Sequence, residues 1–358
     1  MKSISTRIWH LGAGGEQDEQ AIKEAATLLR EGGTVAFPTE TVYGLGADAR
    51  NTEAVADIFR AKGRPSDNPL IVHVAAISQL EELLEPWSEL AGQLMERFWP
   101  GPLTLVLPAR AGAVSPLVTA GLDTLGVRMP RHETALRLIA AAGCPVAAPS
   151  ANRSGRPSPT AAAHVADDLA GAISGIVDDG PAGVGLESTV VELVPGGGVG
   201  GREAMRILRP GGVSAQELLE VGEVLEDSEW EPERQAPRSP GMKYRHYAPQ
   251  GRLTVVTGDA ERVTAHVRRE LAEASRNGLR TGVLTYEEHK GLFEADLVAV
   301  CGSLNDLDTA ARGLYAALRA FDAQQIESIW AEACPVEGIG AALMNRLLKA
   351  ASGHIDQV

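Results

Sequence analysis

Apolar and polar positions divide the first 214 residues into short strands and amphipathic helices. From Asp18 to Arg30 the apolar side chains fall on one helical face, and glycines at 32 and 33 end the helix. Further helices are predicted over Thr52–Ala61, Ser88–Phe98, Glu133–Ala142 and Ala161–Leu169. Short apolar runs predict strands over Thr34–Phe37, Leu70–Val74, Leu103–Leu107, Gly126–Met129, Pro145–Ala148, Gly175–Val177, Thr189–Leu193 and Arg206–Leu208. This mixed order predicts an α/β domain with a twisted, mixed sheet.

Beyond residue 250 the elements alternate regularly. Apolar runs predict strands over Leu253–Val256, Gly282–Leu284, Leu297–Val300 and Ile326–Trp330. Helical periodicity falls between and after them, over Ala260–Arg276, Leu307–Phe321 and Gly340–Ala351. Strand–helix alternation predicts βαβ units, and therefore a second domain with a small, Rossmann-like parallel sheet.

From about Gly222 to Pro249 the composition differs from that of both domains, and we place an interdomain linker at 215–250. Acidic side chains crowd Glu223–Glu233, and prolines stand at 232, 237, 240 and 249. This composition is typical of a largely extended linker between domains at 1–214 and 251–358. Within it, Ser239–Pro249 is a candidate lid over a site in the first domain, and a simple tether is the alternative.

Composition and charge narrow the class of protein. The chain has 358 residues, of which 44% are hydrophobic and 22% charged, as in ordinary two-domain globular proteins. A net charge of -14 argues against an extended nucleic-acid-binding face. Cys144, Cys301 and Cys334 lack metal-ligand spacing, so we expect buried free thiols in a reducing compartment. Without a membrane-length apolar run or a signal-peptide core, we expect a cytoplasmic protein.

Two polar segments punctuated by proline carry the candidate chemistry. The first, KGRPSDNPL at 62–70, follows a predicted helix and holds Lys62 and Arg64 in a stiff connection. The second, APSANRSGRPS at 148–158, begins at the end of a predicted strand. A basic, rigid connection at the end of an element commonly binds an anionic ligand. For either segment alone, a solvated turn is the alternative.

Familiar phosphate-binding patterns fit this chain poorly. Residues 44–49, GLGADA, have the spacing of a dinucleotide fingerprint, but a polar stretch with proline precedes them and the next helix cap is Asn51 or Thr52. A backbone that passes close to a ligand is the better interpretation. The sequence contains no GK[ST] phosphate loop. If ATP binds, its phosphates must be held by cations at the ends of separate elements: Lys62, Arg64, Arg128 and Arg209.

Seven ordered motifs resemble those of the threonylcarbamoyl-AMP synthase family, whose fold is called YrdC-like. They are PTETVYGLG at 38–46, KGRPSDNPL at 62–70, FWPGPLT at 98–104, VRMP at 127–130, APSANRSGRPS at 148–158, ESTV at 187–190 and LRPG at 208–211. A further motif, SPGMKYRHYAP at 239–249, looks like the linker of the family's long, two-domain form. The resemblance implies a YrdC-like catalytic domain over 1–214.

The resemblance implies roles residue by residue. The catalytic KxR and SxN tetrad matches Lys62, Arg64, Ser150 and Asn152. The residues expected to bind ATP are Arg64, Asn68, Thr124, Ser150, Ser158, Arg209 and Ser239. Those expected to bind threonine are Thr41, His73, Arg128, Ala148 and Ser188. His73 lies in an apolar strand, where a structural core histidine is the alternative.

The resemblance also implies a reaction, in which L-threonine, bicarbonate and ATP give threonylcarbamoyl-AMP, pyrophosphate and water. Mg²⁺ is expected on the phosphate oxygens of ATP, without a set of protein carboxylates to hold it. A separate transferase would then place the threonylcarbamoyl group on tRNA. The acidic chain is not expected to hold tRNA stably or to bind a membrane.

Three alternatives stay open on the sequence alone. One is an RNA- or nucleotide-binding module without synthase activity, against which the intact tetrad argues. Another is a hydrogenase-maturation carbamoyltransferase, but the sequence lacks the zinc-finger-like cysteine pairs and the acylphosphatase segment of such enzymes. The third and weakest is a regulator whose C-terminal domain binds an unknown ligand.

Overall fold

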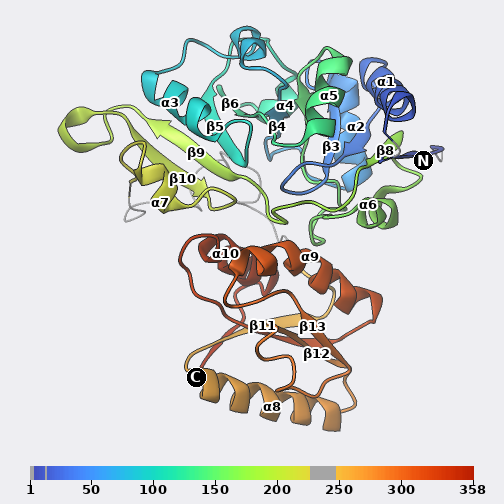
Figure 1. Cartoon of the computed structure of the whole chain (residues 1–358), viewed down its shortest axis with the longest axis vertical. Coiled ribbons are helices and arrows are strands. Elements are labelled where there is room, and N and C mark those ends of the chain that lie inside the picture. The colour runs from blue at the N-terminus through green and yellow to red at the C-terminus, as the bar shows by residue number, and fades with distance from the viewer. Residues whose placement is uncertain (1–3, 13, 226–246) are drawn as a thin grey trace. The chain divides into compact units, whose positions relative to one another are not determined.

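The computed structural model describes residues 4–12, 14–225 and 247–358, which form two compact units (Figure 1). The first unit consists of the residues up to 225, apart from two short loops. Those loops, 155–158 and 184–186, belong with residues 247–358 to the second unit. Most of the predicted linker, including Ser239, lies outside the described residues.

The first unit is built on a ten-stranded mixed sheet in the order β1-β8-β2-β3-β7-β4-β6-β5-β9-β10. The mixed sheet predicted from the sequence is therefore confirmed. Its strands are β1 (Arg7–His10), β2 (Val35–Phe37), β3 (Gly44–Asp48), β4 (Ile71–His73), β5 (Leu103–Pro108), β6 (Thr124–Arg128), β7 (Val146–Ala147), β8 (Gly175–Asp178), β9 (Thr189–Val194) and β10 (Ala204–Arg209).

Helices cover both faces of this sheet. They are α1 (Glu16–Arg30), α2 (Thr52–Lys62), α3 (Glu89–Phe98), α4 (Pro116–Thr119), α5 (Glu133–Ala142), α6 (Ala162–Leu169) and α7 (Ala215–Leu219), with 3-10 turns η1 (Ile77–Glu82) and η2 (Val199–Gly201). Val35 and Phe37 of β2 pack into the apolar cluster of α1 and α5. Ala36 between them packs into the cluster of α2, α3 and α6. Successive residues of the strand thus pack into the apolar clusters on opposite faces of the sheet. Because both faces are covered, the strand sequences are continuous apolar runs.

The ends of α2 place the first polar segment. The Asn51 side chain accepts hydrogen bonds from the backbone N–H groups of Glu53 and Ala54, both at 3.1 Å, and so caps the helix start. Gly63 ends the helix in the left-handed conformation at φ 59°, which favours glycine. Lys62 is therefore the last helical residue, and Arg64 begins the connection to β4.

The second unit contains a five-stranded sheet in the order β13-β12-β14-β11-β15, and every pair in it is parallel. Helix α8 covers one face, and α9 and α10 cover the other (Figure 1). The bounds are β11 (Arg252–Thr257), α8 (Ala260–Arg276), β12 (Thr281–Thr285), β13 (Leu297–Val300), α9 (Leu307–Ala323), β14 (Ser328–Glu332), α10 (Gly340–Ala350) and β15 (Ile355–Gln357). The predicted parallel sheet is confirmed.

The beginning of the predicted linker is folded. Ser214 caps helix α7 at Ala215, and Leu218 is fully buried. The residues from 220 to 225 follow α7 and form a bridge between Met205 and Val224. The acidic composition that starts near residue 223 therefore begins while the chain is still paired with the first unit.

The three cysteines are buried and free, as predicted. Burial raises the pKa of the Cys144 and Cys301 thiols to about 12, so both stay protonated at neutral pH. Among the residues that the structure describes, no helix is long and apolar enough to cross a bilayer.

Candidate active site

Strand directions bring several predicted side chains to one edge of the first sheet. Strand β9 runs parallel to β5, while β6 and β10 run antiparallel to these two. The ends of β6 and β10 therefore lie beside the starts of β5 and β9. Arg128 ends β6, Arg209 ends β10 and Ser188 precedes β9. His73 ends the parallel neighbour β4 and is the register partner of Arg128.

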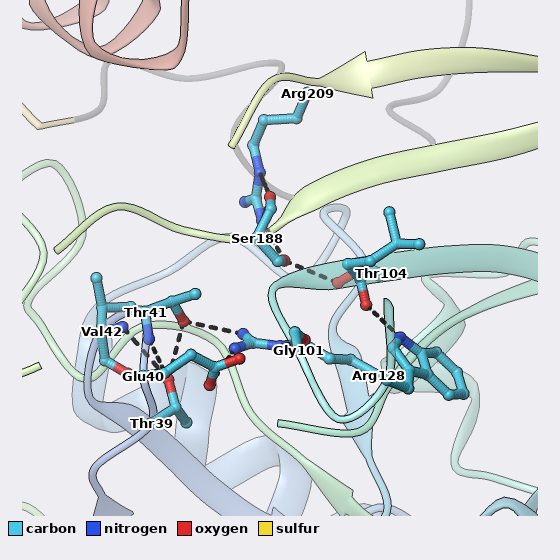
Figure 2. Close-up of polar contacts among 11 residues, drawn as sticks. Thr39, Glu40, Thr41, Val42, Gly101, Thr104, Arg128, Ser188 and Arg209 are labelled. Carbon is cyan, nitrogen blue, oxygen red and sulfur yellow. Dashed lines mark hydrogen bonds and ion pairs between the residues drawn. The ribbon is translucent and has the colours of Figure 1, made fainter. Parts of the chain in front are cut away.

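Arg128 is a buried cation of this edge whose guanidinium is held by several neighbours (Figure 2). It is only 3% exposed, and its guanidinium donates to Thr41 Oγ1 at 2.9 Å and to the Gly101 carbonyl at 3.2 Å. Its Nη2 lies 2.6 Å from Glu40 Oε2, although the two are not aligned as a hydrogen bond. The planar fork is thus held in place by the segment of Thr41, as bidentate recognition of a carboxylate requires.

Glu40 is a site residue that the sequence interpretation missed. Its carboxylate is buried beside Arg128, and its Oε1 atom has no hydrogen-bond partner among the described residues. The available signal was a single charged residue between two threonines in a segment expected to line the site. Thr104 is a second site residue that the sequence interpretation missed, and its hydroxyl lies 2.8 Å from that of Ser188.

His73 is a neutral side chain in this setting. Burial, together with the positive charge of Arg128, lowers its pKa to about 3. The imidazole packs edge-on against Phe37 at a ring separation of 6.1 Å. A neutral imidazole offers one donor and one acceptor, and can recognise a hydroxyl without adding charge.

Ser188 and Arg209 are in direct contact, as Figure 2 shows. Arg209 is 4% exposed and donates to the Ser188 carbonyl at 3.0 Å and to its hydroxyl at 3.2 Å. Gly211 allows this loop to form, since a Cβ there would lie 2.3 Å from the backbone of residues 187–189. A residue expected to bind ATP thus lies against one expected to bind threonine.

The KxR and SxN segments also meet. The buried Lys62 ammonium donates to the carbonyls of Ser150 and Asn152, the latter at 2.6 Å. The Ser150 hydroxyl donates to Asn152 Oδ1 at 2.6 Å. Residues 88 positions apart are therefore tied together, with Lys62 fixing the loop that follows β7.

Arg64 and Asn68 flank this cluster in the connection after α2. Arg64 is partly exposed, and its contacts to the Asn68 and Pro69 carbonyls are long, at 3.4 Å. Asn68 is fully buried, and neither side-chain atom of its amide has a hydrogen-bond partner among the described residues. A buried amide without partners is uncommon in folded proteins and marks a place where a ligand can supply them.

The other predicted residues are placed as follows. Ala148 is buried just after β7, and its N–H donates to the Ile71 carbonyl at 2.9 Å. Thr124 is half-buried at the start of β6, which is the end of that strand away from Arg128. Ser158 is buried in the loop that belongs to the second unit. Ser239 lies outside the described residues.

Two family models together match most of the chain. One, described as telomere recombination, matches residues 27–211, and the other, described as the C-terminal domain of threonylcarbamoyl-AMP synthase, matches residues 213–352. A threonylcarbamoyl-AMP synthase of Bacillus subtilis is 51% identical over 98% of this chain and 99% of its own length. The chain belongs to the threonylcarbamoyl-AMP synthase family. It is an enzyme of the two-domain form, because both family models match in sequence order.

Relatives of this synthase family extend beyond bacteria. The threonylcarbamoyl-AMP synthase of Pyrococcus abyssi is 45% identical over 95% of the chain and 97% of its own length. A crystal structure titled as P. abyssi Sua5 complexed with L-threonine superposes with a TM-score of 0.89 and 43% identity, covering 99% of this chain and all of that one. The synthase fold is therefore shared over both units.

Several polar groups of the site suit an anionic ligand. No group of three or more His, Cys, Asp or Glu side chains within the described ranges could hold a metal. The Lys62 ammonium, the Arg64 guanidinium and the Ser150 hydroxyl are groups of the kind that bind phosphate oxygens.

Proposed function

We propose that this enzyme makes threonylcarbamoyl-AMP from L-threonine, bicarbonate and ATP, with release of pyrophosphate and water. The observation that carries the proposal is the pairing of two clusters in one unit. A buried, oriented guanidinium at Arg128 suits an amino-acid carboxylate, and the Lys62–Ser150–Asn152 cluster suits phosphate. The relative crystallised with L-threonine supports the choice of amino acid.

Threonine recognition follows from the groups around Arg128. The guanidinium takes the carboxylate; Thr41 and Gly101 orient it, and the substrate shares it with Glu40. Thr41, neutral His73 and Ser188 surround the hydroxyl, and Ala148 adds a wall and backbone polar groups. A site built from such polar groups rejects an analogue that leaves them unpaired.

The reaction needs no Ser/His/Asp nucleophile. The amine of threonine combines with bicarbonate to give a carbamate anion and water. One carbamate oxygen then attacks the α-phosphorus of ATP, the bond to the β-phosphate oxygen breaks, and pyrophosphate leaves. Because the nucleophile is already anionic, the enzyme acts mainly through positioning and charge stabilisation.

The nucleotide is held by groups spread over the chain. Arg64 and Lys62 stabilise charge on the phosphates, and Ser150 and Asn152 supply polar contacts beside them. The further nucleotide contacts in this proposal are Asn68, Thr124, Ser158, Arg209 and Ser239. Mg²⁺ would enter with ATP as part of the substrate and would supply charge neutralisation, without a carboxylate set from the protein.

The product is a reactive mixed anhydride that a second enzyme must use promptly. We assign that step to a separate tRNA-modifying transferase, which places the threonylcarbamoyl group on an adenosine of tRNA. A net charge of -14 agrees with an enzyme that does not hold tRNA itself. Such a role places the enzyme in the cytoplasm.

Pyrophosphate release tests the proposal. The purified chain with ATP and Mg²⁺ should release pyrophosphate only when both L-threonine and bicarbonate are present. A nucleotide-binding module without activity would bind ATP and release none. Release that continues without threonine would favour a different adenylation reaction and would contradict the assignment of Arg128.

A further inference from the structure

The second unit contains a pocket that the synthase reaction does not use. Its volume is about 370 Å³, within the size range of small-molecule sites. It opens beyond the carboxyl ends of β11 and β14 and is lined by residues that include Thr257, Gly258, Val263, Tyr286, Glu332 and Cys334.

The position of this pocket follows from the topology of the parallel sheet. Strands β11 and β14 are neighbours, but β11 leads into α8 on one face while β14 leads into α10 on the other (Figure 1). Neighbouring strands whose connections leave toward opposite faces open a crevice between them. Open α/β sheets bind their ligands in that crevice, beyond the carboxyl ends of the strands.

A buried carboxylate forms the polar wall of the pocket. Glu332 ends β14 and is 5% exposed. Its Oε2 atom accepts from the Thr285 hydroxyl, and its Oε1 atom lies 2.9 Å from His289 Nδ1. Burying a carboxylate costs free energy even when it is hydrogen-bonded, so fold stability gives little reason for a charge here.

The polar groups in this wall have spare capacity to accept hydrogen bonds. A carboxylate has about four acceptor positions, and these contacts occupy two on Glu332. The carboxylate favours the His289 tautomer with its proton on Nδ1, which leaves Nε2 as an acceptor. A ligand that complements this wall must therefore bring N–H or O–H donors.

The charges around the pocket select the sign of the ligand. No Lys or Arg is found among the described residues that line it. The nearby helix α8 is capped by the Asp259 side chain, which accepts from the Glu261 N–H at 3.1 Å, and Glu261 adds negative charge to the first turn. The N-terminus of a helix can attract an anion, but the negative charges of Asp259 and Glu261 would repel one here.

Much of the remaining lining is aliphatic, beside the side chains of Thr257, Tyr286 and Cys334. Its aliphatic members include Val256, Val263, Leu304 and Pro335. We propose that this pocket binds a small aliphatic ammonium compound, whose N–H groups donate to Glu332 while its carbon stem lies against the aliphatic walls. The inference does not depend on the proposed synthase reaction, since all its residues lie in the second unit.

Three probes of one shape test the charge requirement: n-pentylammonium, 1-pentanol and pentanoate. Each is titrated into the whole isotope-labelled chain, and the backbone amide signals of residues 257–260 and 333–334 are followed by NMR. The ammonium probe should shift these signals in a saturable way. Pentanol should bind at least about tenfold more weakly, the loss expected for one charge-assisted hydrogen bond, and pentanoate should leave them unchanged.

Two variants and a control locate the effect. Glu332→Gln should weaken pentylammonium binding at least about tenfold. Ala260→Phe, at an exposed lining position, should block the pocket while leaving the carboxylate intact. Glu337→Gln, an exposed carboxylate beyond β14, should behave like the unmodified chain.

Specific results would overturn the proposal. These are pentylammonium leaving the pocket amides unshifted, pentanoate shifting them equally well, or both variants binding the ammonium with unchanged affinity. If Glu332→Gln does not fold, the Ala260→Phe chain decides alone, because it keeps the Thr285–Glu332–His289 contacts.

Discussion

The two sheets of this enzyme end in side chains of opposite charge. The edge of the first sheet buries Arg128 and Arg209, and Lys62 is buried nearby at the end of α2. The edge of the second sheet buries Glu332. Both edges gather polar groups at strand ends, as α/β proteins commonly do. The fold thus fixes where polar groups gather, while the sign of the buried charge selects the kind of ligand that suits each edge.

The two edges also differ in how their buried charges are balanced. Arg128 faces a second full charge at Glu40, 2.6 Å away. Glu332 faces a hydroxyl and an imidazole instead. A substrate that enters the first edge must therefore fit an existing ion pair, whereas a cation that enters the second edge would complete one.

The largest expected effect comes from breaking the ion pair of the first edge. Arg128→Gln leaves Glu40 buried without its counter-charge, which should lower the free energy of unfolding by about 3–5 kcal/mol. The double variant Arg128→Gln/Glu40→Gln should recover much of this loss, since no buried charge is stranded. Urea unfolding of the single and double variants measures these changes in the free energy of unfolding. Equal losses in Arg128→Gln and the double variant would show that the pair is not energetically coupled.

Removal of the Arg64 guanidinium, which is partly exposed, should lower the rate of catalysis without lowering the stability of the fold. Arg64→Ala is expected to lower the rate of pyrophosphate release by about 10²–10³-fold, the cost of one charge-stabilising donor. The free energy of unfolding should change little, because Arg64 is partly exposed in a connecting loop and its truncation opens no core cavity. Arg60→Ala, which removes an exposed partner of Asp57 one turn earlier, is the matched control. A rate near that of the unmodified enzyme would remove Arg64 from the phosphate site.

Substrate selectivity probes the neutral groups around Arg128. L-Threonine should be preferred to L-serine, and L-serine to L-valine, since serine loses a methyl group while valine leaves polar groups unpaired. Each unpaired group should cost about 1–3 kcal/mol of transition-state stabilisation, which lowers kcat/KM. Competition among the three amino acids measures the order. Valine ahead of serine would contradict the roles of Thr41, His73 and Ser188.

The smallest effect concerns the pH dependence of stability. The folded pKa of His73 is about 3, below its ordinary value, so the unfolded chain binds a proton that the folded chain excludes. Stability should therefore fall as pH drops from about 6.5 toward 3, by at most about 1.4 kcal/mol per pH unit from this group. His73→Gln should flatten the profile. Identical slopes for His73→Gln and the unmodified chain would contradict a buried, neutral imidazole.

Most elements could be predicted from the sequence because their apolar patterns are long or uninterrupted. The helices Glu133–Ala142 and Ala260–Arg276 have the predicted bounds. Strand β1 was missed because three of its four residues are exposed on a sheet edge. Strand β3 was missed because Gly44 and Gly46 suggested a loop, although their lack of a side chain lets β3 approach Phe37 closely. Such features depend on packing partners distant in sequence.

The site was predictable in its residue types but not in its pairings. The resemblance named Arg128, Ser188 and Arg209, but no local pattern could reveal that Arg128 pairs with Glu40 or that Arg209 contacts Ser188. These contacts depend on the order of the strands in the sheet. Strands this short do not reveal from sequence alone which strands they will pair with. The pocket of the second unit depends in the same way on β11 and β14 being neighbours.

Mass spectrometry of the product tests the central claim most directly. The enzyme is incubated with ATP, Mg²⁺, L-threonine and ¹³C-bicarbonate, and the quenched mixture is analysed at once. We expect an adduct of AMP and threonine that carries one ¹³C in its carbamoyl group, and this adduct should be absent from the Arg64→Ala reaction. Formation of threonyl-AMP without the labelled carbon, or of AMP with no threonine adduct in freshly quenched samples, would contradict it.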